Sequence, residues 1–166
     1  MHTIRFVGYG GQGVVLASTI LAEAATIEGK HAAQSQSYSA QVRGDVTRGD
    51  VIISDDEIVY PLVENPDIVV AMDKRALKSY PEKGAFVIYD PSLVNGSSFD
   101  PGKSVGIDAT NISIGSIGSP ICANIVLIGA LINRFGILRK ESVEGAIEKH
   151  PKSPENLRAL ELGLKL

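Results

Sequence analysis

The sequence holds very few of the residues with which proteins build metal centres or disulfide frameworks. Cys122 is the only cysteine among 166 residues, so the chain can form no internal disulfide and cannot by itself hold an iron–sulfur cluster. The three histidines, His2, His31 and His150, lie too far apart to predict a metal site from their spacing. A lone free thiol is typical of a reducing compartment, and we expect a cytoplasmic protein.

Long apolar runs and an excess of charge are also missing. The longest apolar run, residues 125–132, is far shorter than the roughly 20 residues that span a bilayer. The amino terminus leads through Arg5 straight into a glycine-rich stretch, which predicts no signal peptide. A net charge of -3 gives no support for a nucleic-acid or anionic-membrane partner. With 44% hydrophobic residues, the chain is expected to form one globular domain over residues 1–166.

The order of the apolar segments predicts alternating strands and helices. Ile4 to Val7, apolar except for Arg5, predicts a buried strand, and the stretch 13–27 predicts a helix covered on more than one side. The further strands expected are 31–37, 51–53, 67–72, 85–89 and 104–109; the further helices are 73–80, 120–135, 141–149 and 154–164; residues 38–49 are expected to form a loop. This alternation predicts a single three-layer α/β/α domain, Rossmann-like, with a mostly parallel or mixed sheet.

The glycine-rich stretch Gly10-Gly11-Gln12-Gly13 lies between the first expected strand and helix. With Gly8 it matches G-x-G-x-x-G, whose helix amino terminus can receive a pyrophosphate. A nicotinamide site also needs an acidic residue about 20 positions later, and the region here reads KHAAQSQS. Three interpretations stay open: a nicotinamide site without its acid, a tight strand-to-helix packing turn, or a site for another anionic ligand or a protein partner.

A second unusual stretch, residues 34–45, is dense in polar donors. It is either a solvated loop or a loop that meets a ligand or a partner, since Tyr38 and Arg43 are residue types common at interfaces. Arg43 and Arg48 could each hold a phosphate or carboxylate, or could pair with the aspartate two positions later.

Five segments together resemble one known family. They are GYGGQGVVLAS, QSQSYSAQVRGD, DVIISDD with Tyr60-Pro61, PDIVVAMD and CANIVLIGAL, and they cover nearly the whole chain. In this order and spacing they are similar to the gamma subunit of 2-oxoacid:ferredoxin oxidoreductases. The second segment departs from the family's usual SYGAEARGG at Ser39, Gln41, Val42 and Asp45.

The resemblance implies a subunit of an enzyme that oxidises a 2-oxoacid with coenzyme A to acyl-CoA, carbon dioxide and reduced ferredoxin. It favours 2-oxoglutarate as the substrate, with pyruvate next. It implies alpha, beta and in some complexes delta partner subunits, which carry thiamine diphosphate, Mg²⁺ and [4Fe-4S] clusters and pass electrons to ferredoxin or another acceptor. The residues expected to contact coenzyme A or a subunit interface are Gly10, Gly11, Gln12, Gly13, Tyr38 and Arg43.

The residues themselves predict no complete catalytic site. Gly44-Asp45 and Gly49-Asp50 are each followed by Val, so no GDG-type thiamine diphosphate motif is present, and no Ser, His and Asp or Cys and His grouping suggests a nucleophile. We therefore expect no catalytic residue, no metal ligand and no cofactor bound by this chain alone. A free-standing NAD(P)-binding oxidoreductase and a non-enzymatic binding module remain the alternatives.

Overall fold

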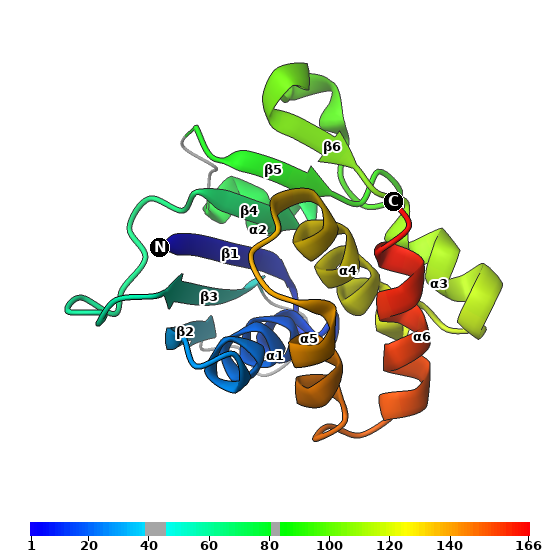
Figure 1. Cartoon of the computed structure of the whole chain (residues 1–166). Coiled ribbons are helices and arrows are strands. Elements are labelled where there is room, and N and C mark those ends of the chain that lie inside the picture. Colours follow the sequence, from blue (N-terminus) through cyan, green and yellow to red (C-terminus); the bar gives the residue numbers. More distant parts are fainter. Residues whose placement is uncertain (39–45, 81–83) are drawn as a thin grey trace.

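The protein is built on one mixed β-sheet flanked by helices (Figure 1). The computed structural model describes residues 1–38, 46–80 and 84–166. The strands are β1 His2–Tyr9, β2 His31–Tyr38, β3 Val46–Ser54, β4 Ile68–Ala71, β5 Phe86–Tyr89 and β6 Ser104–Gly106. Their order in the sheet is β2-β3-β1-β4-β5-β6. β1, β4, β5 and β6 run parallel, whereas β3 runs antiparallel to both of its neighbours.

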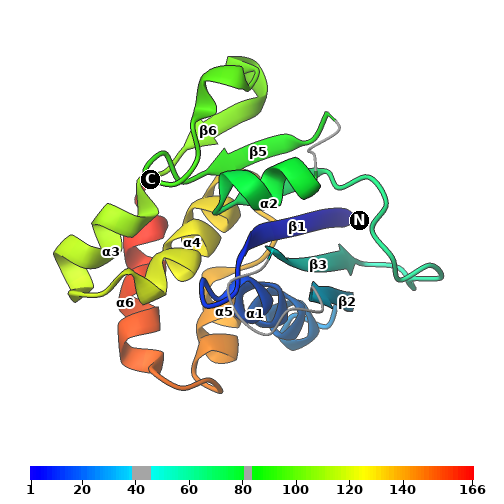
Figure 2. The same ribbon diagram turned by 180° about the vertical axis from the view of Figure 1, so that it is seen from behind.

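The helices form a layer on each face of the sheet, which confirms the expected three-layer α/β/α architecture. They are α1 Val14–Ile27, α2 Lys74–Ser79, α3 Ala109–Ile117, α4 Ala123–Phe135, α5 Lys140–Ile147 and α6 Ser153–Gly163. α1 and α4 pack on one face, and α5 and α6 pack against them, whereas α2 lies on the opposite face (Figures 1 and 2). Within the described ranges, no helix is both long and apolar enough to cross a membrane.

The alternation of β1 divides the core between the two faces. Ile4 and Phe6 pack with α1 and α4 in the larger apolar cluster, and Val7 packs with α2 in the smaller one. α1 touches β1, β2, β3, α4 and α5, which explains why it is apolar on nearly every side.

Local signals fix several helix ends as expected. Ser119 caps a short turn at residues 120–122 that leads into α4, and its Oγ accepts from the N–H of Ile121 at 3.3 Å. α4 ends at Gly136, whose φ of 61° is left-handed, and Gly29 after α1 has a φ of 76°. Asp73 caps α2 by accepting from the N–H groups of Arg75 and Ala76.

Two expectations were wrong. Residues 46–49 belong to β3 and are not a loop; Gly49 lies so close under α1 that a Cβ would meet the side chain of Ser18. β3 lies between β1 and β2, so β2 is an edge strand, which explains its polar composition. The strand expected over 104–109 shrinks to three residues, and α3, which was not expected, begins at Ala109.

Candidate functional site

The glycine loop lies where ligands bind in most α/β folds, at the carboxyl ends of parallel strands. It follows β1, and the neighbouring strands β4 and β5 end at the same edge of the sheet. A pocket of about 260 Å³ opens there, lined among others by Gly11, Gln12, Met72, Thr110 and Ile121. The structure thus places Gly11 and Gln12 of the predicted loop at a concave site with a mostly apolar wall.

Gln12 braces this loop through its side chain. Its Oε1 accepts from the N–H of Tyr9 at 2.6 Å, and its Nε2 donates to the carbonyl of Met72 at 2.9 Å. Both ends of the amide are therefore engaged in joining the ends of β1 and β4. The amide therefore has one N–H and one acceptor position left with which to meet a ligand.

Position 13 requires glycine, both because of its backbone conformation and because a side chain of α4 lies against it. Its φ is 73°, and an added Cβ would collide with the side-chain amide of Asn124 on α4. Asn124 Nδ2 donates to the carbonyl of Gly13 at 3.0 Å, and its Oδ1 is buried with no hydrogen-bond partner among the described residues. The two partners lie 111 positions apart, so the sequence alone gives no sign of this hydrogen bond.

Among the described residues, no side chain caps the amino terminus of α1, which directly follows the loop that lines the pocket. Gly13 offers no side chain, and the first turn holds no acidic residue. The N–H groups of the first turn and the positive end of the helix dipole therefore suit an anion.

The polar loop begins and ends near the same site. Tyr38 pairs through its backbone with Thr47, and Val46 pairs with Tyr9, the last residue of β1. The ends of the loop therefore lie at the edge of the sheet from which the glycine loop emerges. Arg43 lies outside the described residues.

The geometry does not favour a nicotinamide nucleotide. In a dinucleotide-binding fold, the strand that carries the ribose-binding acid lies directly beside the first strand. Here the antiparallel β3 occupies that place and β2 lies one strand further away. The sequence KHAAQSQS lacks the ribose-binding carboxylate, and the strand order likewise differs from that of a dinucleotide-binding fold.

Asp90 and Cys122 border the site but are structural. Asp90 is fully buried and accepts from Ser92 N–H and Oγ at 3.0 and 2.6 Å and from Thr110 N–H and Oγ1 at 2.8 and 2.6 Å. It ties the end of β5 to α3, a role that sequence reasoning missed. Burial raises the pKa of the Cys122 thiol, with Glu155 adding to the effect, so this thiol is a poor nucleophile.

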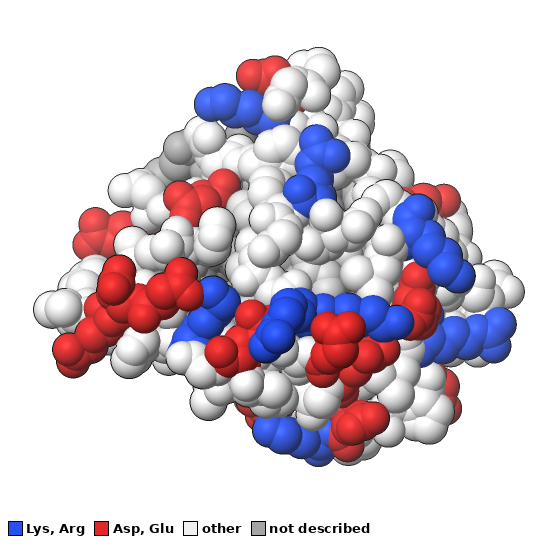
Figure 3. Space-filling view, in the orientation of Figure 1, with Lys and Arg blue, Asp and Glu red and all other residues white. Residues whose placement is uncertain are grey.

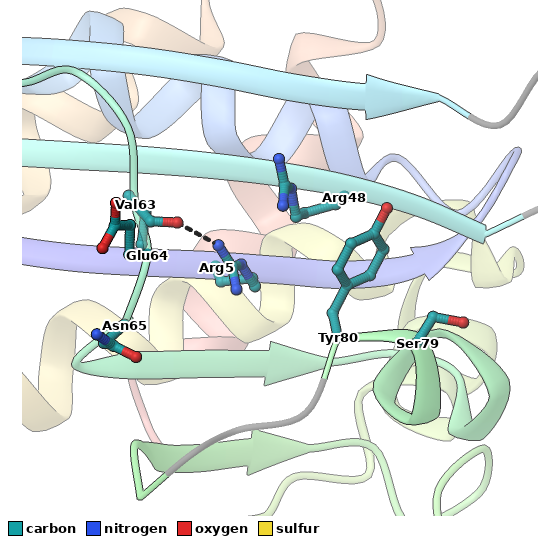
Figure 4. Close-up of a pocket in the computed structure, with 7 residues that line it drawn as sticks. All are labelled: Arg5, Arg48, Val63, Glu64, Asn65, Ser79 and Tyr80. Atoms are coloured by element: carbon teal, nitrogen blue, oxygen red, sulfur yellow. Dashed lines mark hydrogen bonds between the residues drawn. The ribbon is translucent and has the colours of Figure 1, made fainter.

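A second cavity, of about 460 Å³, lies on the α2 face of the sheet (Figure 4). Arg5 donates to Asp50 through Nε at 2.8 Å and through Nη2 at 2.9 Å, and Nη2 also donates to the carbonyl of Val63 at 2.6 Å. Arg48 Nε lies 3.3 Å from Asp50 Oδ2, and the guanidinium lies 5.0 Å from the ring centre of Tyr80.

This second cavity is primarily structural. The pairing of Arg48 with Asp50 was one of the two predicted alternatives, whereas the partnership of Arg5 with Asp50 was missed. A charged residue inside the apolar run 4–7 was the available signal, because a buried charge requires a partner. Among the described residues, no group of three or more His, Cys, Asp or Glu side chains could hold a metal ion.

Comparison with known proteins assigns the class. Residues 3–166 match the family model for pyruvate ferredoxin/flavodoxin oxidoreductase. The chain belongs to this family.

Within this family, the chain is similar to single subunits of 2-oxoacid oxidoreductases. The chain is 41% identical to a 2-oxoglutarate synthase subunit KorC of Archaeoglobus fulgidus, covering 98% of this chain and 86% of that one. It is 34% identical to the pyruvate/ketoisovalerate oxidoreductases common subunit gamma of Thermococcus litoralis, over 89% and 85%. The crystal structure of the keto/oxoacid ferredoxin oxidoreductase gamma subunit of Geobacter sulfurreducens aligns with a TM-score of 0.83 at 34% identity, covering 99% and 97%.

Proposed function

We propose that this chain is the gamma-type subunit of a 2-oxoacid:ferredoxin oxidoreductase, with 2-oxoglutarate as the favoured substrate and pyruvate next. The observation that carries the proposal is the similarity over 98% of the chain to 2-oxoglutarate synthase subunits, at up to 41% identity. The pyruvate and ketoisovalerate relatives match at lower identity. The enzyme joins the acyl group of a 2-oxoacid to coenzyme A, releases carbon dioxide and passes two electrons to ferredoxin.

In this proposal the reacting groups belong mainly to partner subunits in the cytoplasm. Alpha and beta subunits, with a delta subunit where the complex has one, hold thiamine diphosphate, Mg²⁺ and [4Fe-4S] clusters. This chain has a single, buried thiol, and one thiol is too few to ligate an iron–sulfur cluster, so we assign the clusters to the partner subunits.

The glycine loop is the part of this chain that we assign to coenzyme A. The turn at residues 10–13 and the start of α1, which no described side chain caps, fit a phosphate group, because backbone N–H groups and the helix dipole both favour negative charge. The adjoining pocket of about 260 Å³, with its largely apolar wall, suits a slender organic segment. Tyr38 and Arg43 would close over this ligand or seal the contact with a partner.

The complex itself provides the first test. The tagged chain would be purified without oxygen from its native host, and the eluate assayed for coenzyme A-dependent reduction of a viologen dye by 2-oxoglutarate and by pyruvate. Copurified thiamine- and cluster-bearing subunits with 2-oxoglutarate activity are expected. A lone, inactive chain that is stabilised by NAD(H) or NADP(H) would instead support the free-standing oxidoreductase.

The ligand assignment needs a separate experiment. In the assembled enzyme, Arg43→Ala is expected to raise the KM for coenzyme A or weaken assembly, and the exposed Arg158→Ala is the control for losing an arginine. Unchanged coenzyme A kinetics and unchanged assembly in Arg43→Ala would remove Arg43 from the proposal.

A further inference from the structure

The connection between β3 and β4, residues 55–67, exposes an unusual amount of apolar surface. It projects from the amino end of β1, at the left of Figure 1. The exposed fractions are 93% for Val59, 57% for Tyr60 and 52% for Leu62. Single exposed hydrophobic residues are ordinary on protein surfaces, but three within four positions at the tip of one loop indicate an interaction site.

The base of this loop is held firmly in place. Thr3 and Asp67 exchange backbone and side-chain hydrogen bonds of 2.8–2.9 Å. Lys30 pairs with Asp55 at 2.5 Å at the other end. Next to the tip, Val63 is buried, and its carbonyl accepts from the buried Arg5. The apolar side chains are therefore displayed by an anchored backbone, which lowers the entropic cost of binding.

Acidic side chains surround the apolar tip. Residues 55–67 contain five acidic residues and no Lys, Arg or His. Asp and Glu side chains gather around this projection at the left of Figure 3. Asp56, Glu57 and Glu64 are exposed, and Glu64 accepts from the Tyr60 hydroxyl at 3.3 Å.

We infer that Val59, Tyr60 and Leu62 form a docking tip that inserts into an apolar cleft of another subunit, bordered there by Lys and Arg side chains. The presence of such a subunit rests on the proposed function. The acidic charge of the loop indicates which kind of partner binds the tip. Two copies of this chain docked tip to tip would bring together two groups of five carboxylates, and an anionic lipid surface would repel the loop.

The test uses the co-expressed complex and a matched pair of double variants. Val59→Ser with Leu62→Ser removes two exposed hydrophobic side chains from the tip. Ile27→Ser with Ile114→Ser removes two from α1 and α3, where their exposed fractions are 44% and 47%. The tip variant is expected to bind the partner subunits at least about ten-fold more weakly, because buried apolar anchors dominate interface energies. The Ile27/Ile114 control should assemble like the wild type.

Each outcome is decisive. The isolated tip variant should melt at the wild-type temperature, because the substituted side chains are exposed. If the wild type retains its partners and the tip variant retains them equally well, the inference is overturned and the proposed function stands. If the wild type binds no partner, the proposed function fails and the inference fails with it. A wild-type homodimer that the tip variant abolishes would also overturn it.

Charge reversal tests the basic border of the cleft. Asp56→Lys with Glu57→Lys is expected to slow association with the partner at low salt, and the difference should shrink as ionic strength rises. An association rate that is unchanged, or faster, at low salt would contradict the basic border.

Discussion

Asn124 and Gly13, 111 positions apart, meet so closely that no side chain other than hydrogen fits at position 13. The amide of Asn124 donates to the Gly13 carbonyl, which also accepts from the N–H of Ala17 at 2.9 Å. One side chain on α4 therefore fixes the first turn of α1.

Asn124→Ala is expected to lower the free energy of unfolding by about 1–2 kcal/mol, because it removes a buried hydrogen bond and leaves a small void. Asn133→Ala, on the same helix but exposed and bonded to the Leu166 carbonyl, is the control and should cost much less. Urea denaturation of both variants measures the difference. Equal losses would contradict a special role for Asn124.

The contact between α4 and α6 depends on two glycines. A Cβ at Gly129 would lie 2.6 Å from the Leu160 carbonyl oxygen, and one at Gly163 would collide with the Val126 carbonyl. Gly129→Ala should therefore lower stability by about 1–3 kcal/mol through overpacking. Gly115→Ala in α3 meets nothing within 4 Å and should raise stability by roughly 0.5–1 kcal/mol. Thermal melting of the two variants should shift in opposite directions.

The Arg5–Asp50 pair is the most sensitive charged contact described. Arg5→Met or Asp50→Leu alone should cost about 3–5 kcal/mol, because Arg5→Met leaves the buried Asp50 with only the longer contact to Arg48, and Asp50→Leu leaves the buried Arg5 without a carboxylate. The double variant should cost less than the sum of the two. Lys30→Met, which breaks the more exposed pair with Asp55, should cost about 1 kcal/mol or less. Strict additivity in a double-mutant cycle would contradict the coupling.

Cys122 should make stability fall at alkaline pH. Because its folded-state pKa lies above the unfolded-state value, its contribution is complete below the unfolded pKa of about 8.5 and is lost as pH rises through the folded pKa. Unfolding measured from pH 7 to 10 should show a steeper decline for the wild type than for Cys122→Ala. Iodoacetamide should label the native thiol slowly and the unfolded one rapidly. Parallel pH curves would argue against the shift.

Sequence reasoning succeeded where the signal was local. The apolar run 4–7, the cap at Ser119 and the stop at Gly136 each lie within a few residues of the feature that they determine. The order of the apolar segments predicted the fold class, and the five segments that resemble the gamma subunits predicted the family.

Sequence reasoning failed where a feature depends on distant partners. Residues 46–49 resemble a polar loop, and they form a strand because β1 pairs with them and α1 covers Gly49. The charges of Arg5 and Asp50 are tolerated in the interior because the two residues, 45 positions apart in the sequence, pair with each other on the neighbouring strands β1 and β3. No short sequence window contains either relationship.

β1 connects the loop at residues 55–67 to the glycine turn. Its eight residues span about 26 Å; Thr3 near one end is bonded to Asp67 at the base of the 55–67 loop, and the other end continues into the glycine turn. A strand that is hydrogen-bonded to a neighbour on each side is hard to stretch or bend. β1 therefore fixes the distance between the two sites: when the docking tip binds a partner, the glycine turn lies at a constant distance from that contact.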